Sequence, residues 1–109
     1  MGKYIIKKGA GDKFMFNLQA TNGQVILTSQ MYSSKSGCEN GVESVRTNSP
    51  NDGRYERKSS KGGDPYFVLK AANGEIIGNS QMYSADATIE NGIESVKTNG
   101  PSSEVVDES

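Results

Sequence analysis

The sequence contains no histidine and no tryptophan, and it has a single cysteine among 109 residues. Without histidine, the chain lacks the commonest general base and the commonest metal ligand near neutral pH. A lone cysteine excludes an internal disulfide and a zinc site built from clustered cysteines. No catalytic motif stands out either. We therefore expect no cofactor and no metal, and we assign no catalytic residue.

Long apolar runs are also missing. No stretch approaches the roughly 20 apolar residues that a membrane helix needs, and no apolar run follows the charged start Met1–Lys8 as it would in a secretory signal. A single thiol and no export signal favour the cytoplasm. Charge is nearly balanced, with 12 Lys and Arg against 13 Asp and Glu, which disfavours nucleic acid as a partner.

What the chain does contain is an internal repeat. Residues 14–50 and 65–101 align without a gap at an offset of 51, and about 20 of the 37 aligned positions are identical. Tyr4 and Tyr55 keep the same offset. Self-similarity at a fixed period is the signature of duplication.

The repeat therefore predicts two units, 4–54 and 55–105. A unit of about 50 residues buries too little apolar surface to be stable alone. We therefore expect one domain, 1–109, in which 106–109 form a disordered acidic tail.

Each unit begins with a short predicted strand, Tyr4–Lys8 in the first unit, and continues with features of a β-hairpin. Four apolar residues recur with period two and therefore share one face, which predicts a half-buried strand; they are Phe14, Phe16, Leu18 and Ala20. Asn22-Gly23, like Asn73-Gly74 in the second unit, is typical of a tight turn. A two-residue loop would turn Val25 and Leu27 inward. A three-residue loop with a bulge would turn Ile26 inward. Because Gly78 replaces Leu27 in the second unit, we favour Ile26 and Ile77 as core residues.

The next segment of each unit has helical spacing. Apolar residues recur at i, i+4 and i+7 on one face, as Cys38, Val42, Val45 and as Ile89, Ile93, Val96. Ser33 and Ser84 are suited to cap the helix starts, and Pro50 and Pro101 end the helices. Gly41 and Gly92 lie next to the stripes and indicate close packing of each helix against the sheet. Cys38 is interpreted as a structural residue of the apolar face. The Glu39/Glu43 and Glu90/Glu94 pairs are interpreted as solvated.

Three strands and a helix per unit favour an α+β fold with one continuous antiparallel sheet. Both helices would pack on one face of it, related by a pseudo-twofold axis. Such a body needs no second copy to bury its core, and we expect a monomer.

Three strings recur in both units, and in the first they read Phe16-x-Leu18-x-Ala20-x-Asn22-Gly23, Ser29-Gln30-Met31-Tyr32-Ser33 and Asn40-Gly41-Val42-x-Ser44-Val45. With these strings in tandem, nearly the whole chain resembles the YegP-like family of bacterial proteins. The resemblance implies tandem β(3)-α-β(2) repeats in a single sheet, with C-terminal strands exchanged between repeats. It implies no catalytic residue, because the function of the family is unknown.

Candidate binding residues come from two places. The first is the junction between strand and helix, where hydroxyls, amides and the positive helix start could converge on an anionic or polar ligand; its residues are Gln30, Tyr32, Ser33, Gln81, Tyr83 and Ser84. The second is the sheet face away from the helices, where Tyr66 and Val68 would form an exposed patch.

These candidates support three hypotheses. The favoured one is a non-enzymatic interaction or ligand-binding module, with a small molecule or a protein as its partner. An alternative is an enzyme that uses Tyr32 and Tyr83 in symmetry-related pockets. The third is a weak nucleic-acid binder whose basic stretch, interpreted otherwise as a solvated strand edge, is Arg54, Arg57, Lys58 and Lys61.

Overall fold

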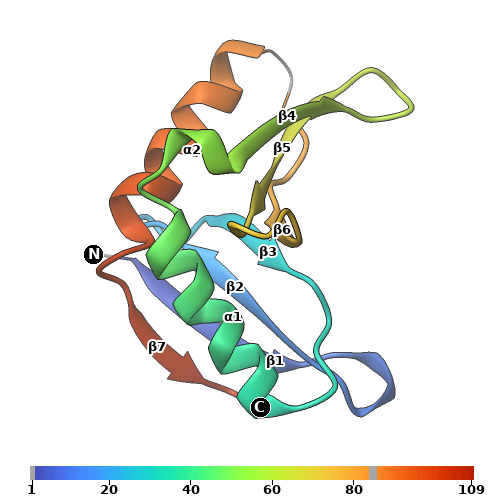
Figure 1. The fold of residues 1–109 in the computed structure, drawn as a ribbon, viewed down its shortest axis with the longest axis vertical. Coiled ribbons are helices and arrows are strands. Elements are labelled where there is room, and N and C mark those ends of the chain that lie inside the picture. The colour runs from blue at the N-terminus through green and yellow to red at the C-terminus, as the bar shows by residue number, and fades with distance from the viewer. Residues whose placement is uncertain (1, 84–85) are drawn as a thin grey trace.

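The computed structural model describes residues 2–83 and 86–109. This part of the chain forms seven strands, two α-helices and two short 3-10 turns (Figure 1). In chain order they are β1 (Lys3–Lys8), η1 (Ala10–Asp12), β2 (Phe14–Gln19), β3 (Val25–Ser29), α1 (Lys35–Asn48), η2 (Asp52–Arg54), β4 (Tyr55–Ser59), β5 (Pro65–Lys70), β6 (Ile76–Asn79), α2 (Asp86–Asn99) and β7 (Glu104–Asp107).

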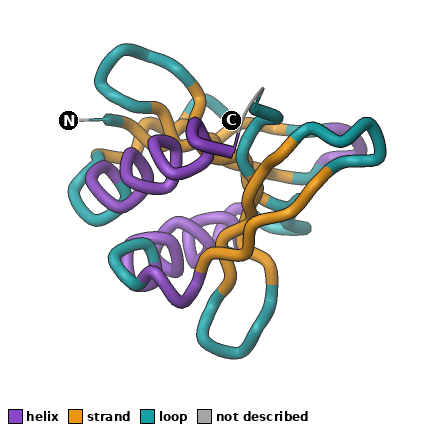
Figure 2. Tube along the Cα trace, turned by 90° about the horizontal axis from the view of Figure 1, so that it is seen from above, coloured by secondary structure: helices purple, strands orange, loops and turns teal. Residues whose placement is uncertain are grey.

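All seven strands belong to one sheet, in the order β4-β5-β6-β3-β2-β1-β7. The two helices cover the same face of this sheet, as Figure 2 shows. The α+β architecture with a single sheet is thus confirmed. None of the helices in the described residues is long and apolar enough to cross a membrane.

The topology differs from the expectation in two details. Each repeat contributes three strands and a helix, and a single further strand, β7, follows α2. This strand is exchanged between repeats, because it pairs with β1 of the first repeat, but the pair is parallel rather than antiparallel. β7 runs parallel to β1 because α2 ends close to the start of β1. The Tyr4 hydroxyl of β1 donates to the Gly100 carbonyl at 2.6 Å, so that β7 starts beside the start of β1.

Both hairpins use a three-residue loop with a bulge. The Gly23 amide donates to the Ala20 carbonyl at 2.9 Å, and Gly23 has φ +84°, a left-handed conformation that glycine adopts without strain. A register shift between Leu18 and Gln19 then places both Ile26 and Leu27 in the core. The preference for Ile26 is confirmed, and Leu27 is buried as well because the bulge turns two successive side chains to one face.

The helices pack on the sheet through the stripes that the sequence predicts. Cys38, Val42 and Val45 on α1 are buried, and so are the corresponding residues of α2, Ile89, Ile93 and Val96. The start of α1 is a correction: Ser34, not Ser33, is the cap, because the helix begins at Lys35 and the Ser34 Oγ accepts from the Gly37 amide at 3.1 Å. The corresponding cap at Ser84 lies outside the described residues.

The pseudo-twofold axis relates the two repeats, and near it corresponding residues of the two repeats contact each other. Thr28 of β3 is paired with Asn79 of β6, which lies 51 positions later. A side chain at Gly78 would meet the Leu27 Cγ at 3.2 Å, and one at Gly100 would overlap the Ser49 hydroxyl. In the contacts of Gly78 with Leu27 and of Gly100 with Ser49, one repeat therefore has a glycine where the other has a larger residue.

Residues 106 and 107 were expected to belong to a disordered tail, but the structure places both in β7. Asp107 forms an ion pair with Lys35 of α1 at 2.8 Å. The Glu108 amide donates to the Ile6 carbonyl at 2.8 Å. The chain end is thus held against both the sheet and a helix.

Candidate functional site

Two pockets lie at the two junctions between strand and helix, one in each half of the molecule. The first has a volume of about 360 Å³ and the second about 240 Å³. Ten lining positions correspond one to one at the offset of 51. The first pocket has Gln30, Tyr32, Gly37, Asn40, Gly41, Ser44, Ala71, Asn73, Glu75 and Ile77, and the second has Gln81, Tyr83, Thr88, Asn91, Gly92, Ser95, Ala20, Asn22, Gln24 and Ile26.

Each pocket is built from both repeats. In the first pocket, the junction and α1 come from the first repeat, and the β5–β6 hairpin comes from the second. The Gln30 amide donates to the Ile77 carbonyl at 3.2 Å, which holds the end of β3 beside β6. The pockets therefore exist only because the two repeats share one sheet.

A tyrosine forms one wall of each pocket. The Tyr32 ring stacks on Phe16 with centroids 6.4 Å apart and an angle of 11°, and Tyr83 stacks on Phe67 in the same way. A Cβ at Gly41 would lie 2.7 Å from Tyr32 Cζ and would overlap the hydroxyl. Close packing was expected between the helix and the sheet; the structure adds that the nearest neighbour of this glycine is the tyrosine of the junction, with the Phe16 ring of β2 next at 3.0 Å.

The hairpin loop closes the opposite side of each pocket. In the first pocket, the Asn73 Oδ1 accepts from the Glu75 amide at 3.0 Å, and Gly74 has φ +87°. This side-chain bond to the backbone is the Asx turn that asparagine favours. It holds the loop in a fixed conformation and leaves the Asn73 amide nitrogen, a donor, available at the pocket.

Burial raises the pKa values of both tyrosine hydroxyls. Desolvation is the main cause for Tyr32, and the nearby Cys38 adds to it; desolvation alone acts on Tyr83. A raised pKa keeps a phenol protonated at neutral pH, so these groups can donate hydrogen bonds but cannot act as bases. Among the described residues, neither the Tyr32 nor the Tyr83 hydroxyl has a hydrogen-bond partner within the protein.

The two pockets differ in charge. Glu75 lines the first pocket where Gln24 lines the second, and Gly37 corresponds to Thr88. No lysine or arginine lines either pocket in the part of the chain that the structure describes. The start of α1 also contributes little, because the Ser34 side chain already accepts from the Gly37 amide. An anionic ligand is therefore disfavoured at these junctions.

The structure brings together four of the predicted junction residues. Gln30 and Tyr32 line the first pocket, and Gln81 and Tyr83 line the second. Ser33 is exposed and does not line either pocket. Ser84 lies outside the described residues.

The sheet face away from the helices is less exposed at Tyr66 and Val68 than the sequence predicts. Tyr66 is half-buried, and Val68 is only 4% exposed. Val68 is paired with Glu56, and the ion pair between Glu56 and Lys70 flanks it on that face. Long charged side chains therefore cover the valine, which cannot be part of an exposed apolar patch.

The basic stretch is largely neutralised by its neighbours. Arg57 binds Glu90 through two hydrogen bonds of 2.5 and 2.8 Å, and Lys58 lies 3.4 Å from Glu56. The Arg54 Nε donates to a side-chain amide oxygen at 3.0 Å. These cations do not form a free face for phosphates.

Metal and thiol chemistry find no support in the described residues. No group of three or more acidic or cysteine side chains is placed to hold a metal ion there. The Cys38 side chain is fully buried, and burial raises its pKa to about 11. A protonated, buried thiol is unreactive, as its place on the apolar stripe indicates.

Sequence reasoning missed the hairpin side of each pocket. Asn22 and Asn73 were interpreted only as turn residues. The available signal was that both turns recur with the same flanking residues, but nothing in the sequence shows that each turn faces the helix of the other repeat.

These features place the chain among the small α+β proteins in which two tandem repeats share one sheet. The chain belongs to the DUF1508 family, a domain of unknown function whose model matches residues 10–56 and 60–107. It is 53% identical over 106 residues to a UPF0339 protein of Shewanella oneidensis, covering 97% of this chain and 96% of that protein. It is 48% identical over 107 residues to the UPF0339 protein YegP of Yersinia pestis, covering 98% and 96%. The resemblance to YegP-like proteins is thus confirmed.

Two solution structures have the same fold. The UPF0339 protein SO3888 of Shewanella oneidensis superposes with a TM-score of 0.91 at 53% identity, over 97% of this chain and 90% of that one. The protein yegP of E. coli, described as a protein of unknown function, gives a TM-score of 0.92 at 50% identity, over 98% and 92%. The relatives share the architecture and leave the function open.

Proposed function

We propose that the protein is a binding module that takes one small, neutral, hydrogen-bonding ligand in each of its two pockets. The observation that supports this proposal is the correspondence of ten lining positions across the two repeats. Packing of the helices against the sheet requires the apolar stripes, but it does not require polar side chains at the same places in two separate pockets.

The lining defines the class of ligand. Each pocket combines a tyrosine hydroxyl, a serine hydroxyl and side-chain amides, which together offer both donors and acceptors. A flat aromatic wall favours a ligand with a planar or apolar side. Nucleosides and simple sugars have this combination of polar edges and an apolar face.

Catalysis is not part of this proposal. Raised pKa values at Tyr32 and Tyr83 suit hydrogen-bond donors rather than bases. We further propose that the protein acts as a monomer, because both pockets are complete within one chain. A reducing compartment such as the cytoplasm suits the free thiol of Cys38.

The proposal is tested by titrating the ¹⁵N-labelled protein with uridine and with glucose and following amide chemical shifts. Asn40 and Asn91 are exposed and correspond to each other in the two pockets. We expect shifts at both pockets in the unaltered protein. Asn40→Phe should fill the first pocket and abolish its shifts while leaving those of the second, and Asn91→Phe should do the reverse.

Each variant is therefore the matched control of the other. The proposal fails if neither probe shifts the pocket amides at millimolar concentration. It also fails if the shifts persist when both phenylalanines are present, since the ligand would then bind elsewhere.

A further inference from the structure

Glu39 and Glu90 occupy corresponding positions on the two helices, but they differ in their partners. The Arg57 guanidinium of β4 donates to both oxygens of the Glu90 carboxylate, from Nε at 2.5 Å and from Nη2 at 2.8 Å. The residue of β1 that corresponds to Arg57 is Ile6. Among the described residues, the Glu39 side chain has no ion pair and no hydrogen bond. The first repeat therefore has the carboxylate without the guanidinium.

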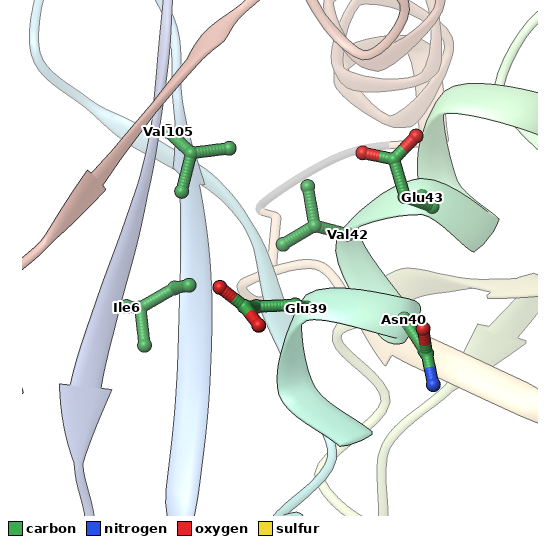
Figure 3. Close-up of a pocket in the computed structure, with 6 residues that line it drawn as sticks. All are labelled: Ile6, Glu39, Asn40, Val42, Glu43 and Val105. Carbon is green, nitrogen blue, oxygen red and sulfur yellow. The ribbon is translucent and has the colours of Figure 1, made fainter. Parts of the chain in front are cut away.

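An open groove lies between Glu39 and Ile6. It has a volume of about 200 Å³ and is bounded by α1 on one side and by β1 and β7 on the other. Figure 3 shows the Glu39 side chain extending from α1 toward Ile6, with Val42 and Val105 also lining the gap. Ile6 and Val42 are buried, whereas Val105 is 42% exposed. The groove thus has an apolar floor and opens to solvent beside Val105.

The other charges around the groove are already paired. Glu43, which also lines the groove, lies 3.2 Å from the Arg46 Nε. Lys35, one helical turn before Glu39, forms the ion pair with Asp107 at 2.8 Å. The groove therefore offers one unpaired carboxylate above an apolar floor, and a cation on an aliphatic stem complements both features.

The second repeat indicates which cation fits. A guanidinium is planar, so its fork of donors matches the two oxygens of a carboxylate, as it does between Arg57 and Glu90. It is also more weakly hydrated than an ammonium, so it can lie against apolar side chains at lower cost. One difference limits the affinity: Asp52, a second carboxylate 3.8 Å from Arg57, corresponds to Ser103 in the first repeat.

We propose that the groove between β7 and α1 binds an alkylguanidinium group from outside the chain. Glu39 accepts two hydrogen bonds from the guanidinium, which takes the place that Arg57 has beside Glu90. The aliphatic stem lies on Ile6, Val42 and Val105. Free alkylguanidines and arginine side chains of polypeptides share this chemistry. The site does not depend on the ligands of the two junction pockets.

The probes are n-butylguanidinium and N-acetylarginine N-methylamide, titrated separately into the ¹⁵N-labelled full chain at low salt. We expect amide shifts at Glu39, Val42 and Val105, with dissociation constants in the millimolar range because one ion pair has to offset the entropy of binding. The affinity should fall as salt is raised. Tighter binding of butylguanidinium supports a free small molecule as the ligand, and tighter binding of the blocked arginine supports a polypeptide side chain.

The controls separate the ion pair from general charge and from apolar contact. n-Butylurea has the same shape as butylguanidinium without its charge and should bind more weakly. Glu39→Gln should weaken the binding of butylguanidinium about fivefold, the upper range for an exposed ion pair. Asp64→Asn removes one negative charge from the exposed loop between β4 and β5, outside the groove, and should leave the affinity unchanged.

A fourth variant supplies the guanidinium from the chain itself. Val105→Arg, at an exposed position of the groove, should weaken the binding of both probes because its side chain competes for Glu39. The proposal is overturned if neither probe shifts the groove amides at tens of millimolar, or if butylurea binds as tightly as butylguanidinium. It is also overturned if Glu39→Gln and Asp64→Asn weaken binding equally, or if Val105→Arg leaves the affinity unchanged.

Discussion

Replacing Gly41 with alanine tests how the tyrosine wall of the first pocket is held. In an exposed helix, glycine to alanine stabilises by about 1 kcal/mol. Here the new Cβ would lie 2.7 Å from Tyr32 Cζ and 3.0 Å from the Phe16 ring. Phe16 is fully buried, so the tyrosine must move, and overpacking of this kind costs about 1–3 kcal/mol. We expect Gly41→Ala to lower the free energy of unfolding by up to about 2 kcal/mol.

The sign should reverse when the ring is absent. In a Tyr32→Ala background, Gly41→Ala meets no tyrosine, and the Phe16 ring 3.0 Å away has space to shift, so the change should stabilise by up to about 1 kcal/mol, the intrinsic helix preference. The coupling between the two positions is then about 1–3 kcal/mol, well above the error of a double-mutant cycle. Urea unfolding of the four proteins measures it directly, and each kcal/mol corresponds to roughly 4 °C in Tm.

The second repeat provides the control, because a Cβ at Gly92 meets Tyr83 in the same way. The pair Gly92→Ala and Tyr83→Ala should give a coupling of the same sign and size. If Gly41→Ala stabilises the unaltered protein as much as the Tyr32→Ala variant, the tyrosine does not lie against the helix and the pocket wall described here is wrong.

Three further predictions concern the core and the chain end. Tyr4→Phe removes the hydroxyl that donates to the carbonyl beyond α2, and should cost about 1–2 kcal/mol in urea unfolding because that buried acceptor loses its partner; an unchanged midpoint would contradict the bond. Cys38, with a pKa raised to about 11, should react with a thiol reagent at pH 8 only as fast as the protein opens, so urea should accelerate the reaction strongly. The hydrogen bond from Lys35 lowers the pKa of Asp107 below its ordinary value of 3.8, so the stabilisation is complete above that value and is lost as pH falls below it. An NMR titration of Asp107 should therefore show a depressed midpoint that Lys35→Gln moves upward.

Much of the fold could be predicted from local patterns. The apolar stripes on both helices follow from spacing, and the Asn-Gly pairs predict the two turns. The length of the turns was open in the sequence, and only the replacement of Leu27 by Gly78 favoured the three-residue loop with a bulge. The resemblance implies an exchanged C-terminal strand, but local patterns could not place β7, because two valines flanked by Glu104 and Asp107 have little preference of their own. Its position depends on where α2 ends and on the ion pair between Asp107 and Lys35.

The pockets were predictable only in part. Gln30 and Tyr32 were identified because they recur and flank a helix start. Asn73 was not, because its contact with that junction is made across the sheet and no local signal reports it. The predicted exposure of Val68 was wrong for a related reason. Alternation predicts which face of the sheet a residue lies on, but coverage by Glu56 and Lys70 depends on the neighbouring strands.

The glycines on the pseudo-twofold axis have a consequence for how such a body can evolve. On an exact axis, a residue meets its own copy, so two identical chains would place leucine against leucine at the Leu27 position or glycine against glycine at the Gly78 position. The first arrangement is too crowded and the second leaves a hole. Joining both units in one polypeptide removes that restriction, because each copy can then mutate alone and one large side chain can fill the space that its small counterpart vacates.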